Sequence, residues 1–199
     1  MRAILLDMYG VIIKQTGDDF APYIRRTFPK LTTEEIYVPW IKAAGGELTS
    51  AEVWRALGFE SDIDEIEKCY LDTMEVSEGF YDFASMASAS CKMAVISNDI
   101  REWSEYLRGK FDINKYFETI SISGDLKMRK PDARIFELTI EQLGCRAEDC
   151  VYVDDREGNL KAASKIGMNA ILFNSGHGRY EGKTVDDFAQ LAKMLFYCD

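Results

Sequence analysis

The amino-acid sequence predicts an α/β protein built on a doubly wound parallel sheet, with a small helical segment inserted after the first strand. Short apolar runs rich in β-branched residues recur along the 199-residue chain, and helix-length segments separate most of them. Such an alternation is typical of a parallel sheet that helices cover on both faces. One longer stretch between the first two runs has helical character and almost no strand signal, which indicates the insertion.

The strands are expected where the apolar runs fall. They are predicted over residues 2–6, 92–97, 119–121, 150–153 and 169–173. A helix is expected over residues 133–143, because Pro131 and Asp132 precede it as a typical helix start, and another over residues 159–165. Gly144 and Gly167 follow these two segments as predicted C-terminal stops.

The stretch from about residue 13 to residue 78 is too long for a simple crossover connection. Thr32-Thr33-Glu34-Glu35 and Thr49-Ser50-Ala51-Glu52 resemble helix N-termini with capping residues, and Gly45-Gly46 separates two helices. We therefore predict two units, namely a core domain formed by residues 1–13 and 79–199 and a helical insert formed by residues 14–78.

The composition argues against several kinds of partner. A formal net charge of −10 and an isoelectric point near 4.7 disfavour nucleic acids and anionic membrane surfaces, because both require basic stripes. No apolar stretch approaches the roughly 20 residues of a membrane span. The chain also shows no signal-peptide pattern, so a cytoplasmic location is expected. Five cysteines without a Cys-x-x-Cys pair favour reduced thiols over a disulfide framework or a zinc site.

Polar side chains follow the predicted strands at the points where the strands end. Asp7 comes directly after the first strand, and Gly10 lets the chain turn away just after it. Ser97 and Asn98 supply a hydroxyl and an amide at the end of the second strand. Each has a purely structural explanation, since Asp forms turns and a Ser-Asn pair caps helices. Because ligands of open α/β sheets bind beyond the carboxyl ends of the strands, we expect these side chains at one crevice.

Two later segments add charged groups to the same crevice. Pro131 fixes the backbone at a helix start. Lys130, directly before it, is the best candidate for a fixed positive charge. The fourth strand ends in the adjacent acids Asp154 and Asp155, which raise each other's pKa unless a cation lies between them and Asp7. Carboxylate oxygens with open water positions suit Mg²⁺, so the sequence predicts a magnesium site here.

In their order and spacing, these four segments resemble the motifs of the haloacid dehalogenase superfamily. The matches are residues 7–11 for the first motif, Ser97 for the second, Lys130 with Pro131 for the third, and Asp154-Asp155 followed by Gly158-Asn159 for the fourth. The resemblance covers the whole chain. It implies a Rossmann-like core, a small helical cap formed by the insert, and phosphatase activity on a small phosphate ester such as a sugar phosphate.

The same resemblance implies a role for each matched residue. Asp7 would be the nucleophile that forms an aspartyl-phosphate, while Ser97, Asn98 and Lys130 would hold the phosphoryl oxygens. Asp7, Asp155 and the backbone carbonyl of Tyr9 would bind Mg²⁺. Asp154 would be either a further metal ligand or a partner of Lys130.

Tyr9 departs from the pattern of the superfamily's phosphatases, which usually carry a second Asp two residues after the nucleophile as general acid and base. A phenol with a reference pKa of about 10 is a poor base at neutral pH, although it donates a hydrogen bond. Tyr9 also matches the Asp-x-Tyr-Gly segment of 2-haloacid dehalogenases, in which the Asp displaces a halide without a metal. The acidic pair Asp154-Asp155 disfavours this alternative, because it would repel a carboxylate substrate, and Val11 stands where those dehalogenases have Thr.

Other interpretations stay open. A binding protein with weak or no turnover would tolerate the loss of the acid, although it has no need of the nucleophile Asp7. A mutase requires the missing acid, and phosphonate cleavage requires a cap lysine, for which Lys30 and Lys42 have no placement from sequence. The single histidine, His177, is expected in a loop beyond the fifth strand, and the mechanism does not require it.

Substrate choice is expected to depend on the insert, which would close over the crevice and favour small substrates. The residues that are candidates for facing the crevice are Arg25, Arg26, Tyr37, Trp40, Lys42 and Trp54. The tryptophans among them also suit core packing, and the arginines suit solvent. The expected partner is a small phosphate ester, and the expected assembly is a monomer or a homodimer.

Overall fold

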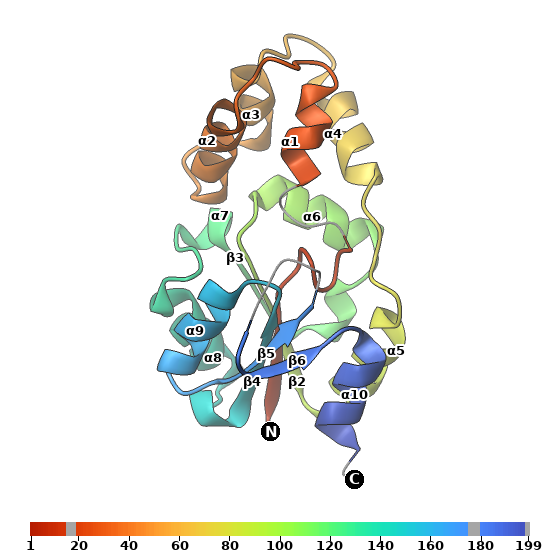
Figure 1. Ribbon diagram of the computed structural model, residues 1–199, viewed down its shortest axis with the longest axis vertical. Helices are drawn as coiled ribbons and strands as arrows, with labels where there is room; N and C mark the ends of the chain where they lie inside the picture. The colour runs from red at the N-terminus through yellow and green to blue at the C-terminus, as the bar shows by residue number, and fades with distance from the viewer. Residues whose placement is uncertain (15–18, 175–179, 198–199) are drawn as a thin grey trace.

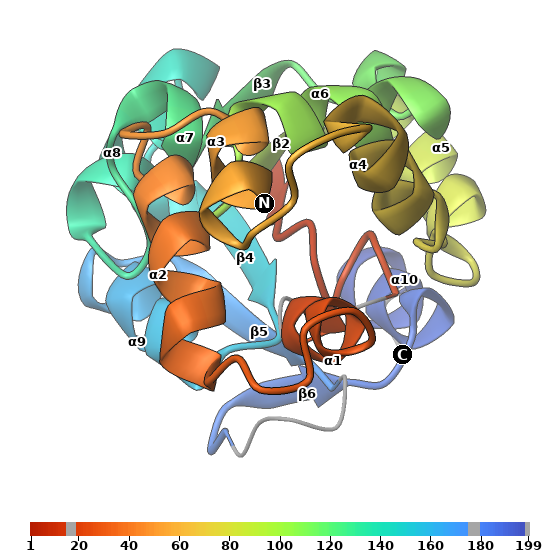
Figure 2. The same cartoon turned by 90° about the horizontal axis from the view of Figure 1, so that it is seen from above.

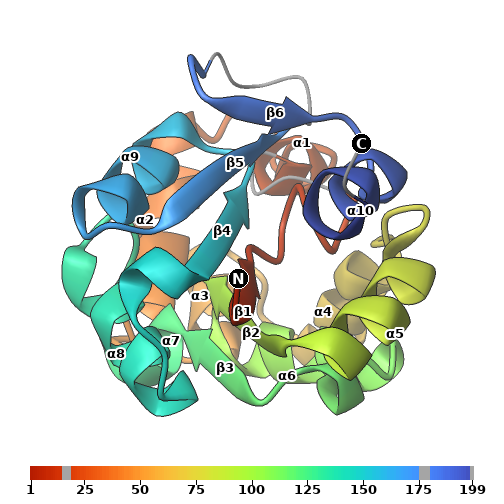
Figure 3. The same ribbon diagram turned by 90° about the horizontal axis from the view of Figure 1, so that it is seen from below.

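The computed structural model describes residues 1–14, 19–174 and 180–197, and it places a parallel sheet between two layers of helices (Figures 1 and 3). Within the described residues the sheet has six strands in the order β3-β2-β1-β4-β5-β6, and each neighbouring pair is parallel. The bounds of the strands are β1 Ala3–Leu6, β2 Lys92–Ser97, β3 Thr119–Ile122, β4 Cys150–Asp154, β5 Asn169–Phe173 and β6 Lys183–Val185. The predicted fold class is confirmed.

All five predicted strands are present, with ends that differ from the prediction by one residue at most. The sixth strand, β6, was not predicted. It has only three residues, and Lys183 and Thr184 are exposed at the edge of the sheet. A strand of this kind needs no apolar run, so it leaves no signal in the sequence.

Alternate residues of each inner strand pack on opposite faces of the sheet, as the period of two in a strand requires. Ile4 and Leu6 of β1 belong to one hydrophobic cluster, whereas Ala3 and Leu5 belong to another. The first cluster includes side chains of α5 Phe80–Ser90, α6 Arg101–Lys110 and α10 Phe188–Phe196. The second includes side chains of α8 Ala133–Leu143 and α9 Glu157–Lys165. Because both faces are covered, β1 is apolar throughout, and β2 and β4 carry polar residues only at their ends.

The predicted helices are confirmed at α8, whose bounds match, and at α9, which begins two residues earlier than expected. Gly144 is the C-cap of α8 in a left-handed conformation, and Gly167 follows α9 with φ of +96°. Three short helical segments complete the core, namely η2 Asn114–Tyr116, α7 Ser123–Leu126 and η3 Ala147–Asp149.

Four further helices lie together beyond the carboxyl ends of the strands (Figures 1 and 2). They are α1 Phe20–Arg25, α2 Thr33–Ala44, α3 Ser50–Ala56 and α4 Ile63–Asp72. Both predicted capping boxes are present, one formed by Thr32 and Glu35 and the other by Thr49 and Glu52. The assignment of residues 14–78 to a separate cap domain stays a prediction.

Glu67 of α4 joins these helices to the core. Its carboxylate accepts hydrogen bonds from the indole N–H of Trp54 on α3, at 2.8 Å, and from that of Trp103 on α6, at 2.7 Å. Both tryptophans are almost completely buried, and their rings pack 6.0 Å apart. A second link is made by Ser123, whose hydroxyl donates to the backbone carbonyl of Ala44 at 2.6 Å.

Several remaining expectations concern exposed or chemically reactive groups. Cys69, Cys91, Cys145 and Cys150 are free thiols, as predicted, whereas Cys198 and His177 lie outside the described residues. Trp54 is fully buried in packing. None of the described helices has the length and apolar character that crossing a membrane requires.

We predict that Glu67→Ala lowers the free energy of unfolding by about 2 to 4 kcal/mol, because it leaves two buried indole N–H groups without an acceptor. Urea unfolding followed by tryptophan fluorescence measures this change. Glu67→Gln keeps an acceptor oxygen, so its free energy of unfolding should fall less. Glu65→Ala, at an exposed position of the same helix, is the matched control and should change stability by no more than about 0.5 kcal/mol. Equal losses for Glu67→Ala and Glu65→Ala would contradict the prediction.

Candidate active site

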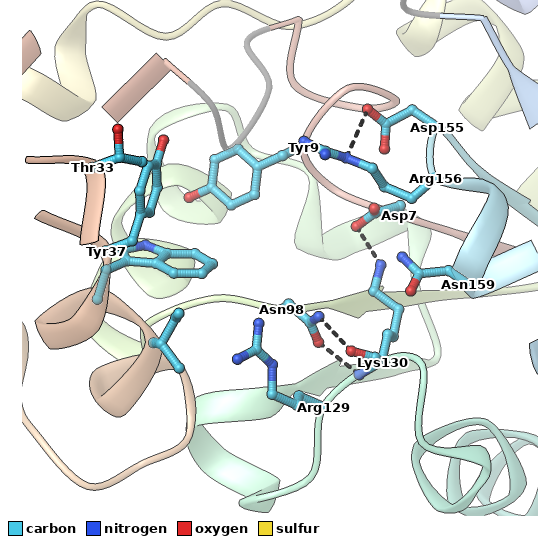
Figure 4. Close-up of a pocket in the computed structure, with 12 residues that line it drawn as sticks. Asp7, Tyr9, Thr33, Tyr37, Asn98, Arg129, Lys130, Asp155, Arg156 and Asn159 are labelled. Carbon is cyan, nitrogen blue, oxygen red and sulfur yellow. Dashed lines mark hydrogen bonds and ion pairs between the residues drawn. The ribbon is translucent and has the colours of Figure 1, made fainter. Parts of the chain in front are cut away.

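A cavity of about 470 Å³ lies between the carboxyl ends of β1, β2 and β4 and the helix α2 (Figure 4). Of the residues predicted to form a site, it is lined by Asp7, Tyr9, Asn98, Lys130 and Asp155. Of the insert residues expected to face the crevice, it is lined by Tyr37 and Trp40. Sheet register explains the arrangement, because Leu6 is paired with Val153 and Asp7 and Asp154 therefore leave adjacent strands at the same level. Ser97 and Asp154 are next to these residues in sequence but do not form part of the cavity wall.

Asp7 is 6% exposed at the end of β1. Its Oδ1 accepts the backbone N–H of Met8 at 2.6 Å and lies 2.7 Å from Nζ of Lys130. Burial raises the pKa of Asp7 well above its ordinary value, and the neighbouring carboxylate of Asp154 adds to the rise, while Lys130 opposes it. The raised pKa favours the protonated carboxyl group, and the positive charge of Lys130 is the contribution that favours the ionised, nucleophilic form.

Lys130 lies between two carboxylates, with Nζ 2.7 Å from Oδ1 of Asp7 and 2.9 Å from Oδ2 of Asp154. Burial by itself would lower the pKa of Lys130, but these two carboxylates outweigh it and the pKa is raised. The ammonium is thus charged at neutral pH. Its side chain is only 1% exposed, so water screens the charge weakly.

The amide of Asn98 fixes the backbone of Lys130. Its Nδ2 donates to the carbonyl of Lys130 at 2.9 Å, and its Oδ1 accepts the N–H of Lys130 at 2.8 Å (Figure 4). The following peptide bond, Lys130–Pro131, is cis. Sequence reasoning assigned Asn98 to substrate binding and missed this reciprocal pair, which connects residues 32 positions apart.

Asp154 is fully buried, and its hydrogen-bonding capacity is used within the protein. It accepts hydrogen bonds from Lys130, from the hydroxyl of Tyr152, from the backbone N–H of Arg156 at 2.7 Å, and from Nδ2 of Asn159 at 3.1 and 3.0 Å. Burial would raise the pKa of Asp154, but Lys130 and the hydrogen bonds outweigh it and the pKa is lowered. This geometry favours Asp154 as the partner of Lys130 among the two roles that the sequence left open.

Asp155 lines the cavity beside Asp7, and its side chain is 2% exposed. Nε of Arg156 lies 3.7 Å from its Oδ2. On the other side it is packed against Gly10, which has a φ of +80°. A Cβ at this position would overlap the carboxylate of Asp155, so both the backbone conformation and the space require glycine.

The carboxylates form a set that suits a divalent cation. Asp7, Asp154 and Asp155 each offer one oxygen within 4.8 Å of the others, and all three residues are buried. Lys130 neutralises one of the three negative charges, and Arg156 approaches from a partly exposed position. Hard oxygen donors with this excess of negative charge fit Mg²⁺, so the residues present are compatible with the ion that the sequence predicts.

Comparison with known proteins identifies the family. A family model described as haloacid dehalogenase-like hydrolase matches residues 48–173. The chain belongs to this family. It is therefore a hydrolase. The parallel sheet and the strand-end residues described above agree with membership of this family.

Relatives of this haloacid dehalogenase-like hydrolase include phosphatases. The chain is 26% identical to phosphoglycolate phosphatase of Aquifex aeolicus, over 94% of its own length and 91% of that enzyme. It is 27% identical, over 87% of its length, to drimenol cyclase drtB of Aspergillus calidoustus, but it spans only 34% of that protein. The fold is shared with the wild-type enzyme BT-2542 of Bacteroides thetaiotaomicron, solved with magnesium and inorganic phosphate, at a TM-score of 0.74 and 19% identity over 89% of this chain and 96% of that one.

Ser97, which matches the second motif of the family, is fully buried at the end of β2. Among the described residues its Oγ has no hydrogen-bond partner. A buried hydroxyl without a partner is rare in folded proteins and calls for a ligand or a water molecule. Its assignment as a phosphoryl-binding residue stays a prediction.

Tyr9 stands at the position where the chain departs from the phosphatase pattern, and its hydroxyl donates to Asp99, a residue that sequence reasoning missed. Its hydroxyl lies 3.1 Å from each carboxylate oxygen of Asp99. Asp99 is fully buried, and burial raises its pKa to about 8 even though hydrogen bonds from Ile100 and Tyr9 oppose the rise. The only sequence signal was an acid directly after Ser97 and Asn98, which is also typical of a helix cap.

We predict that Asp99 makes the stability of the protein fall as the pH rises between about 4 and 8. In this window the unfolded carboxyl group is ionised while the folded one keeps its proton, so that the folded state binds more protons. Each pH unit then costs up to about 1.4 kcal/mol. Asp99→Asn removes this contribution to the pH dependence of stability but keeps an acceptor for Tyr9. Urea unfolding at pH 5.5 and 7.5 should show the variant gaining stability relative to wild type by about 1 to 2.5 kcal/mol; a constant difference would contradict the assignment.

Proposed function

We propose that this hydrolase is a Mg²⁺-dependent phosphatase that cleaves a small phosphomonoester, such as a sugar phosphate, through an aspartyl-phosphate on Asp7. The observation that carries the proposal is Asp155, a second carboxylate that lines the cavity beside Asp7 while Asp154 is turned toward Lys130. The similarity to a phosphoglycolate phosphatase over nearly the whole chain supports it.

In the proposed reaction a carboxylate oxygen of Asp7 attacks phosphorus in line, and the ester bond to the leaving group breaks. The leaving oxygen takes up a proton from solvent. A water molecule then attacks phosphorus of the aspartyl-phosphate and loses a proton to solvent, while the bond between phosphorus and the Asp7 oxygen breaks, which releases inorganic phosphate and restores the Asp7 carboxylate. Lys130 neutralises negative charge on the phosphoryl oxygens next to Asp7. Asp7, Asp155 and the Tyr9 carbonyl would hold Mg²⁺, which supplies further charge neutralisation at the phosphoryl group when bound.

Other residues keep Lys130 in place for this reaction. Asp154 holds the ammonium at 2.9 Å, and Asn98 holds the backbone of the same residue on both sides of its peptide unit. Ser97 would satisfy its hydroxyl on a phosphoryl oxygen. Binding and orientation of the phosphoryl group therefore depend on residues from three separate segments of the chain.

Protonation of the leaving group is the weak point of the site. The hydroxyl of Tyr9, at the position where the acid is expected, donates to Asp99 rather than to a group in the cavity. A substrate whose leaving group departs without a proton bypasses this deficiency. We also propose that the enzyme acts in the cytoplasm, as a monomer or homodimer, on small molecules.

The alternative of a 2-haloacid dehalogenase is favoured by one observation, the tyrosine that follows Asp7 by two residues. The lining of the cavity disfavours a dehalogenase, because Asp155 beside the nucleophile would repel the carboxylate of its substrate. A binding protein without turnover would have no need of Asp7 held 2.7 Å from Lys130. Chloride release from 2-chloropropionate tests the first alternative, and ligand binding without phosphate release tests the second.

We predict that phosphate release requires both Mg²⁺ and Asp7. Asp7→Asn should lower kcat at least about 10³-fold, because the amide is no nucleophile, and EDTA should abolish activity in wild type. The measurement is phosphate release from acetyl phosphate, p-nitrophenyl phosphate, glucose 1-phosphate and glucose 6-phosphate. Asp64→Asn, at an exposed position of α4, is the matched control and should keep wild-type activity. Release that persists in Asp7→Asn would exclude the proposed nucleophile.

We also predict a strong preference for good leaving groups, since the Tyr9 hydroxyl stands where the acid is expected and donates to Asp99. Acetyl, aryl and anomeric sugar phosphates should react about 10² to 10⁴ times faster than simple alkyl phosphates. The test is kcat/KM across a series of esters of known leaving-group pKa. A rate that does not depend on this pKa would show that another group protonates the leaving oxygen.

A further inference from the structure

Two arginines line the cavity, and they differ in their surroundings. Arg156 is close to a carboxylate, with its Nε 3.7 Å from Asp155. Arg129 is half-buried, and its guanidinium makes no ion pair or hydrogen bond with the part of the chain that the structure describes, although its backbone carbonyl accepts the N–H of Asp132. A guanidinium is always charged in proteins, and its planar donors match a planar anion. Arg129 therefore offers an uncompensated cation to a ligand in the cavity.

The chain holds Arg129 close to the reacting groups. It directly precedes Lys130, so its Cα lies about 3.8 Å from that of Lys130. The two cations have different tasks, since Lys130 is already enclosed by Asp7 and Asp154. Figure 4 shows the Arg129 side chain entering the cavity near Asn98, away from Asp155 and Arg156. One small molecule can thus reach Asp7 with its phosphate and Arg129 with another group.

The wall formed by α2 has a different character. Thr33, Tyr37, Trp40 and Ile41 line the cavity, and their spacing places them on one face of the helix. The face carries two aromatic rings and no acidic residue, and the rings of Tyr37 and Trp40 meet edge to face with centroids 6.3 Å apart. Such a wall suits the flat, weakly polar body of a ring compound.

We propose that the substrate is a phosphomonoester whose leaving group is a flat ring that carries a carboxylate. Arg129 binds the carboxylate, while Tyr37 and Trp40 cover the ring. A single free guanidinium matches one planar carboxylate, which it binds through two parallel N–H donors. The cavity of about 470 Å³ accommodates one ring with its two anionic groups. This inference rests on the proposed phosphatase function and names the substrate class of the same site.

The experiment compares 3-carboxyphenyl phosphate with the neutral 3-carbamoylphenyl phosphate. Each is assayed with wild type, Arg129→Met, Arg129→Lys and Arg55→Met, the last being an exposed arginine of α3 outside this cavity. For each substrate, kcat/KM of wild type is divided by kcat/KM of the variant. This ratio cancels the intrinsic reactivity of the leaving group. Thermal unfolding of each variant confirms that it is folded.

Arg129→Met should lower kcat/KM for the carboxylate substrate about 10- to 100-fold, mainly through KM, and lower that for the amide less than about 3-fold. Arg129→Lys should restore part of the loss, and Arg55→Met should change neither substrate. Equal losses for both substrates would overturn the proposal, because Arg129 would then bind the phosphoryl group. No loss for either substrate would overturn it as well.

The aromatic half of the proposal has its own test. Trp40→Leu should raise KM for both aryl substrates about 3- to 10-fold and leave acetyl phosphate unaffected, with the preference for the carboxylate unchanged. An unchanged KM for the aryl substrates contradicts ring binding by this wall. If wild type releases no phosphate from any substrate, the phosphatase proposal fails. Calorimetric binding of the same two aryl phosphates to wild type and Arg129→Met then makes the same comparison, and equal affinities would overturn the carboxylate assignment.

Discussion

The site depends on one electrostatic constraint at the ends of β1 and β4, namely that clustered buried carboxylates need positive charge beside them. Three carboxylates are buried within reach of one another, and one buried ammonium compensates them. Removing the ammonium of Lys130 would be costly, because it leaves clustered negative charges in a medium that stabilises charges poorly. The remaining negative charge suits a divalent cation. Under the proposed function, this cation and Lys130 together would offset the net charge of −10 where a phosphoryl dianion binds.

The scaffold meets this constraint through the register of the sheet, the space beside Gly10 and hydrogen bonds to the backbone. Parallel register brings Asp7 and Asp154 to one level, and Gly10 leaves room for Asp155. The amide of Asn98 fixes Lys130 from the neighbouring strand. The site is therefore assembled from strand ends that the sheet holds rigidly, while the helix α2 supplies the wall that faces the remainder of a substrate.

The sequence predicts the five apolar strands and the strand-end acids, because buried parallel strands and motif spacing leave strong local signals. It does not reveal β6, which is short and exposed. It also misses contacts between distant segments, such as Asn98 with Lys130 and Tyr9 with Asp99, since each partner alone resembles an ordinary cap or turn residue. The sequence also does not show that the guanidinium of Arg129 has no counter-ion among the described residues, because only the folded chain brings cations and anions together.

The most direct test of the charge constraint is the free energy of unfolding with and without Mg²⁺, measured for wild type and Asp155→Asn. Mg²⁺ that binds the folded state should stabilise wild type by an amount that grows with its concentration. Asp155→Asn should be the more stable protein without Mg²⁺, since one of three clustered charges is gone, and should respond to Mg²⁺ weakly. An equal response of both proteins, or none in wild type, would contradict the central role given to these carboxylates.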